Sequence, residues 1–239
     1  MAMDKKKFIE QFIHAFGNVE LPIVFWYSAE PAAEPQKTRG CFIKYLKPAR
    51  EGGIVSLDAE TISCMGGKTY TGFIEAPSFI PDFVSGKERY KETPEQVSDF
   101  IHDLNIPKAS EPYINFASIG YVDDLQKAEG IAFFATPDVL SGLVSWTLFD
   151  TMDPNAVSVP FGSGCSSLIS QTIVENRKNG KRSFLGLFDP SVRPAVESNI
   201  LCLTIPMSRF NEMYQTMDES CLQGTHAWKK VRERINDGI

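Results

Sequence analysis

The stretch Ala-Val-Ser-Val-Pro-Phe-Gly-Ser-Gly-Cys-Ser-Ser, residues 156–167, predicts a strand, a glycine-framed turn and the start of a helix. The first four residues are small or apolar, as in a short buried strand. The helix continues to about residue 178, where Asn179-Gly180 is a typical stop signal. A strand followed directly by a helix is the basic unit of a mixed α/β fold, and this unit places Cys165 at the first helical turn.

A second copy of this order of elements lies earlier in the chain. Residues 54–57, Ile-Val-Ser-Leu, predict a strand, and the turn Cys64-Met65-Gly66-Gly67 follows it. Val55 and Val157 are 102 positions apart, and Cys64 and Cys165 are 101 apart, so the spacing is nearly conserved. We therefore expect an internal duplication, with repeats at 21–74 and 129–190 and a helical insertion at 75–112. The alternative is a chance echo, which any α/β chain can produce.

The remaining periodicity completes a prediction of one domain over residues 1–239. Its fold class is α+β (mixed α/β), with the duplicated βαβ-like unit built around a mixed sheet. Strands are expected at 21–27, 54–57, 114–119, 131–136, 156–159, 184–188 and 200–205. Helices are expected at 4–17, 93–104, 137–149, 166–178, 207–217 and 225–235. The start of the insertion, with Pro77 and Pro81, is expected to be a loop.

Charge and hydropathy exclude several classes of function. The 239 residues carry a formal net charge of −6, which repels phosphate backbones, so we expect no nucleic-acid partner. No apolar run is long enough to span a membrane, and Glu10, Gln11 and His14 interrupt the only segment resembling a secretory signal. We therefore expect a cytoplasmic protein with reduced thiols. The oligomeric state is not predicted; a homodimer is one alternative.

The two glycine-framed turns are the predicted binding site. A helix N-terminus offers free N–H groups and a dipole that favours negative charge. Glycine lets the backbone approach a ligand closely, and a thiol in this position is expected to have a lowered pKa. The leading hypothesis is therefore a binding module for a small anionic ligand or cofactor. The candidate residues in the turns are Cys64, Gly66, Gly67, Gly164, Cys165 and Ser166.

Two further hypotheses use the thiols for chemistry. Thiolates of Cys41, Cys64 and Cys165 would suit a metal ion or an iron–sulfur cluster, although the chain has no closely spaced cysteine pair. Alternatively, Cys165 is the nucleophile of a thiol enzyme. The three histidines are expected on the surface, so they give little support to a Cys–His pair. A purely structural or partner-binding subunit also remains open.

Two charged segments are additional candidates. Asp189 and Arg193, in Phe-Asp-Pro-Ser-Val-Arg-Pro, either pair with each other to shape a loop or bind an anionic ligand. Arg89 and Tyr90 lie in a segment that either leads into the helix of the insertion or forms a lid over the site.

Seven segments in this order resemble the ArCR-type family, domain of unknown function 169, of bacteria and archaea. They are LPIVFWY, GCFIKYLKPAREG, CMGGKTYTGF, GKERYKETPE, LSGLV, VPFGSGCSS and GLFDPSVRP, and the resemblance extends from about residue 8 to residue 232. It implies no activity, because the family has none assigned. The residues that match its motifs are Cys41, Cys64, Gly66, Gly67, Arg89, Tyr90, Gly164, Cys165, Asp189 and Arg193.

Overall fold

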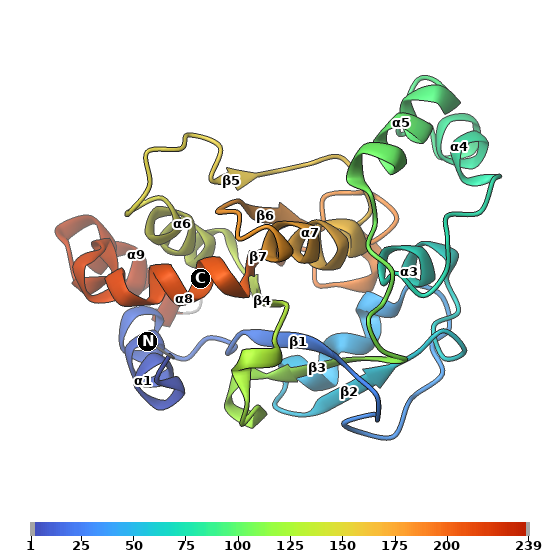
Figure 1. Ribbon diagram of the computed structural model, residues 1–239. Helices are drawn as coiled ribbons and strands as arrows, with labels where there is room; N and C mark the ends of the chain where they lie inside the picture. The colour runs from blue at the N-terminus through green and yellow to red at the C-terminus, as the bar shows by residue number, and fades with distance from the viewer. Residues whose placement is uncertain (1–2, 238–239) are drawn as a thin grey trace.

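A computed structural model describes residues 3–237, in which seven strands form one mixed sheet (Figure 1). The strands are β1 (Ile23–Ser28), β2 (Ile54–Leu57), β3 (Tyr113–Ser118), β4 (Gly130–Ala135), β5 (Val157–Ser158), β6 (Ser183–Gly186) and β7 (Leu201–Pro206). Their order is β2-β3-β1-β4-β7-β6-β5, and all neighbours are antiparallel except β5 and β6. The predicted α+β class is thus confirmed.

Helices cover both faces of the sheet. The α-helices are α1 (Lys5–Phe16), α2 (Lys47–Arg50), α3 (Met65–Tyr70), α4 (Ile80–Asp82), α5 (Pro94–Leu104), α6 (Pro137–Thr147), α7 (Gln171–Arg177), α8 (Met207–Met213) and α9 (His226–Asp237). A 3₁₀-helix, η1 (Phe42–Leu46), precedes α2. Two segments are π-helical: η2 (Phe83–Lys87) follows α4, and η5 (Ser166–Ser170) precedes α7. The other 3₁₀ segments are η3 (Ile119–Tyr121), η4 (Leu125–Lys127), η6 (Arg193–Ala195), η7 (Tyr214–Glu219) and η8 (Cys221–Gln223).

Alternation along the strands divides the core into two clusters. In β4, Ile131 and Phe133 pack on one face, whereas Ala132 and Phe134 pack on the other. The side chains of a strand point alternately to its two sides, so a strand buried on both faces is apolar throughout. This explains why the expected strand at 131–136 is a continuous apolar run.

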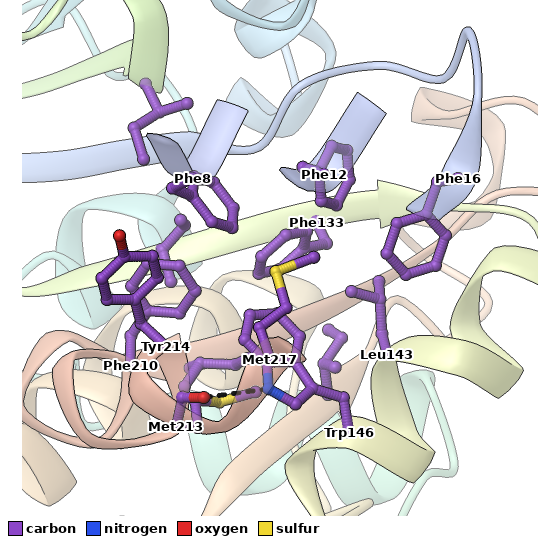
Figure 2. Packing of buried hydrophobic residues seen from close by; sticks show 14 of the residues in the cluster. Phe8, Phe12, Phe16, Phe133, Leu143, Trp146, Phe210, Met213, Tyr214 and Met217 are labelled. Carbon is purple, nitrogen blue, oxygen red and sulfur yellow. Dashed lines mark hydrogen bonds between the residues drawn. The ribbon is translucent and has the colours of Figure 1, made fainter. Parts of the chain in front are cut away.

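The first cluster joins the sheet to α1, α6, α8 and α9. Its centre is aromatic (Figure 2), and the rings of Phe8 and Phe210 meet edge to face with 5.1 Å between their centroids. The buried indole of Trp146 donates a 2.9 Å hydrogen bond to the carbonyl of Met213. Large aromatic side chains bury much apolar area, so this face supplies a large part of the stability.

The second cluster lies on the opposite face and supports the candidate site. It packs η1, α2, η5 and α7 against the strands, and it includes Cys165 and Cys202. The insertion, with α4 and α5, projects away from the sheet on the side of α3 (Figure 1). Residues 80–87 were expected to be a loop, but they form α4 and η2; Pro81 fits there because the first helical turn needs no N–H from it.

The two strands that the sequence aligned as repeats are both edge strands. However, β2 pairs antiparallel with β3, whereas β5 has only two residues and pairs parallel with β6. The internal duplication therefore stays a prediction. A separate expectation concerned membranes: within residues 3–237, the helices are all too short or too polar to cross a bilayer.

Candidate functional site

A cavity of about 700 Å³ lies where the two cysteine turns meet the insertion. Its walls come from residues 64–70, from helices of the insertion between residues 79 and 100, from the turn 160–165 and from the loop 188–192, together with Gly40 and Cys41. We call it the cysteine cavity. Segments that are far apart in the sequence therefore form one site, and both glycine-framed turns contribute to it.

Most of the predicted site residues line this cavity. They are Cys41, Cys64, Gly66, Gly67, Tyr90, Gly164, Cys165 and Asp189. The three glycines differ in how much space surrounds their α-carbons. A Cβ on Gly67 would lie 2.7 Å from the sulfur of Cys64, and one on Gly164 would lie 2.8 Å from Leu187, whereas a Cβ on Gly66 would meet nothing within 4 Å. Two of the glycines are thus required by close packing, and Gly66 leaves open space.

Three predicted residues do not line the cavity: Ser166, Arg89 and Arg193. Ser166 is fully buried, and its hydroxyl accepts a hydrogen bond from Gln171. The side chain of Arg89 is exposed.

Arg193 has a structural role. Its guanidinium donates hydrogen bonds to four backbone carbonyls, those of Leu187, Glu197, Ser198 and Ile200, at 2.7–3.1 Å. Those contacts hold the 187–200 segment and leave the side chain no free face for an anion. Arg193 therefore shapes the loop by donating to backbone carbonyls. The alternative in which it pairs with Asp189 is not what the structure has.

The thiols differ from the expectation of thiolates. Burial raises the pKa of Cys165 far above its ordinary value, although the side chain of Ser163, 3.0 Å from its sulfur, acts in the opposite direction. Burial likewise raises the pKa of Cys41. Desolvation disfavours a charged thiolate, and here it outweighs the helix terminus. Both thiols are therefore protonated near neutral pH, which argues against Cys165 as an activated nucleophile.

A catalytic or metal role for the thiols finds no geometric support. All five cysteines are free, as the sequence predicted, and Cys41, Cys64 and Cys165 are near enough to influence one another's charge. Within residues 3–237, however, His, Cys, Asp and Glu side chains form no group of three or more that could hold a metal ion. The three histidines are exposed, as expected, and none lines the cavity. The described residues therefore do not fit a metal ion, and the iron–sulfur cluster stays a prediction.

The charged side chains on the wall of the cavity are acidic. They are Glu88 and Asp189; among the described residues no Lys, Arg or His belongs to the wall. Lys91 lies just outside it, with its ammonium 4.5 Å from the centre of the Phe161 ring. The carboxylate of Asp189 contributes to the raised pKa of Cys41 and Cys165. The expected preference for an anion is therefore not supported, because the wall offers negative charge.

The rest of the wall is strongly apolar and partly open to solvent. Phe79, Phe83 and Phe188 are between 42% and 51% exposed, and all three line the cavity. Deeper in the wall, the rings of Phe100 and Phe161 meet edge to face at 4.9 Å. Exposed aromatic side chains gathered at one cavity are a common feature of ligand and partner sites.

The backbone beside the cavity is also unusual. Leu187 and Arg89 have left-handed φ angles of 68° and 56°. The other non-glycine residues of the described chain with positive φ are asparagines, which tolerate it more readily. The π-helical segments η2 and η5 lie at the same site, and such segments are frequent at functional sites. Strained backbone therefore concentrates around this cavity.

Sequence reasoning missed the aromatic side of the cavity. Phe79, Phe83 and Phe188 were not candidates, because each lies in a segment expected to be a loop or a strand end. The available signal was the run Ser-Phe-Ile-Pro-Asp-Phe-Val, residues 78–84, whose apolar residues have no obvious core to join.

A second cavity, of about 680 Å³, lies at the carboxyl end of β4. Residues of α1, β4, the start of α6, the segment 199–200 and α9 line it, together with Val19 and Glu20. Arg234 binds both carboxylate oxygens of Asp138 across it. We call it the ion-pair cavity, and it contains none of the predicted site residues.

Comparison with known proteins agrees with the resemblance in the sequence. The model of a family described as uncharacterised ArCR, domain of unknown function 169, matches residues 21–216, which includes both cysteine turns and the insertion. No curated protein and no solved structure gives a significant match.

Proposed function

Since the chain belongs to the uncharacterised ArCR family, whose description assigns no activity, we propose from its site alone that it binds a small molecule in the cysteine cavity. The observation that carries the proposal is the 700 Å³ cavity itself, whose wall combines exposed aromatic side chains with few polar groups. This volume lies within the range of small-molecule sites, which are mostly apolar.

The position of the site supports the same proposal. The insertion contacts the rest of the chain across the cavity, so a ligand there would be held between α4, α5 and the turn at Cys165. Burying Phe79 and Phe83 against a ligand would remove apolar surface from water, which is favourable. The protein thus acts as a binding module in this proposal, with protonated thiols as part of its wall.

The test uses Nile red, a neutral apolar dye whose fluorescence rises when it leaves water. We expect saturable binding with one site per chain. Gly66→Phe places a ring where the backbone leaves open space, so it should weaken binding at least about tenfold. The matched control is Asn199→Phe, which adds the same ring in the ion-pair cavity and should leave the affinity unchanged.

Thermal unfolding of both variants verifies that they fold. If Nile red fails to saturate, or if both variants bind it as tightly as the unaltered chain, the proposal is wrong.

A further inference from the structure

Asp189 has a carboxylate oxygen that the protein does not satisfy. Its Oδ1 accepts hydrogen bonds from the hydroxyl of Ser191 and from the backbone N–H of Val192, the latter at 3.2 Å. Its Oδ2 is buried and has no hydrogen-bond partner within residues 3–237. Buried carboxylate oxygens are normally paired, so this residue of the cavity wall carries negative charge that hydrogen bonds within residues 3–237 satisfy only in part.

Among residues 3–237, the side chains that line the cavity include no cation that could pair with this oxygen. Arg193, four residues away, uses its guanidinium on four carbonyls. The other charged residue of the wall is Glu88, which adds negative charge. Cys165 and Tyr70, which also line the cavity, supply no positive charge in either protonation state, and burial raises the pKa of both.

The aromatic wall suits the same kind of ligand. Ring faces attract cations, and Lys91 over Phe161 is an example within this structure. Phe79, Phe83 and Phe188 offer three more rings to the cavity, and they would also cover an apolar body. A molecule with a positively charged nitrogen and a hydrocarbon or aromatic body would satisfy both the carboxylate and the rings.

We infer, on the basis of the function proposed above, that the ligand of the cysteine cavity is an organic cation: a protonated amine, or a related N–H donor, on an apolar body. Asp189 is the specificity-determining residue, because its carboxylate supplies negative charge at the wall of the cavity. The helix termini at Met65 and Ser166 contribute no anion site, since α3 has six residues and the N–H of Ser166 is bonded to Ser163.

The experiment compares three probes with one carbon skeleton: 4-phenylbutylamine, 4-phenylbutanol and 4-phenylbutyrate. Each displaces Nile red from the full-length protein at pH 7. We expect the amine to bind at least about tenfold more tightly than the alcohol, because the carboxylates of Asp189 and Glu88 and the ring faces attract a cation and not a neutral group. The carboxylate should be the weakest, since it meets Asp189 and Glu88.

Asp189→Asn should remove the preference for the amine, and thermal unfolding verifies that the variant folds. The matched control, Glu111→Gln, deletes an exposed acid that does not line the cavity and should keep the preference. The inference is overturned if Nile red binds but the alcohol or the carboxylate matches the amine, or if Asp189→Asn keeps the ranking. Absence of Nile red binding would instead reject the proposed function, so the two failures are distinguishable.

Discussion

The cysteine cavity and the ion-pair cavity have nearly equal volumes, about 700 and 680 Å³, but they differ in how their charged groups are satisfied. In the ion-pair cavity, Asp138 is bound by Arg234, and Glu20 is bound by Arg50 at 2.8 and 2.9 Å. In the cysteine cavity, Asp189 keeps an orphan oxygen. The two cavities are therefore alike in volume and differ in their unsatisfied polar groups and in their exposed aromatic side chains.

The largest change to this comparison is expected from removing Arg50, which binds Glu20 of the ion-pair cavity wall. Its buried guanidinium binds Glu20 and Glu197 and lies 4.8 Å from the centre of the Phe134 ring. We expect Arg50→Ala to lower the free energy of unfolding by about 2–3 kcal/mol, less than for a fully buried pair because both acids are partly exposed. Urea denaturation measures this loss.

The control is Lys47→Ala, which deletes an exposed ion pair to Glu51 at 3.6 Å and should cost less than about 0.5 kcal/mol. Nile red binding should survive Arg50→Ala under folding conditions, since Arg50 does not line the cysteine cavity. Equal losses for the two variants would show that the ion-pair cavity is not held by its charges.

A smaller effect distinguishes the two adjacent glycines of the cysteine cavity. In Gly67→Ala the new methyl would lie 2.7–2.9 Å from Cys64, Phe42 and Ile62, so we expect a loss of about 1–3 kcal/mol by overpacking. Gly66→Ala meets no atom and gains helix propensity, so it should be neutral or stabilising by up to about 1 kcal/mol. Thermal unfolding compares the pair, and similar melting temperatures would contradict this packing.

The smallest effect is the pH dependence of the Arg50 network. A hydrogen bond from its own backbone N–H and the guanidinium of Arg50 lower the pKa of Glu197 below its ordinary value of 4.5. A folded-state pKa below the unfolded one stabilises the protein above about pH 4.5, and this contribution disappears as the pH falls through the folded value. Wild-type stability should therefore fall between about pH 5 and pH 3.

Glu197→Gln should lose less of its stability over that interval, as measured by melting temperature against pH. Glu111→Gln, at an exposed acid, serves as the control and should follow the wild-type curve. Superimposable curves for Glu197→Gln and wild type would mean that the interaction with Arg50 contributes nothing in solution.

Much of the fold was predictable because it depends on local patterns. The Thr93-Pro94 start of α5 was recognisable because a threonine cap accepts a hydrogen bond from a free N–H of the first turn, and a proline at the first position has no N–H to leave unsatisfied. The strand at 54–57 was located residue for residue. The start of the insertion was not, because Pro77 and Pro81 suggested a loop, whereas α4 is a helix that packs against α5 and η2 of the same insertion.

The sequence by itself determined the strands, most helices and the two cysteine turns, because periodicity and turn chemistry act between neighbours in the chain. Only the tertiary structure decided that both turns face one cavity and that aromatic residues of the insertion complete it. It also decided the electrostatics of the site. Burial raises the pKa of Cys165, and the guanidinium of Arg193 donates its hydrogen bonds to four backbone carbonyls. Desolvation and hydrogen-bond partners come from residues distant in the sequence, so the electrostatics of the site could not be read from its motifs.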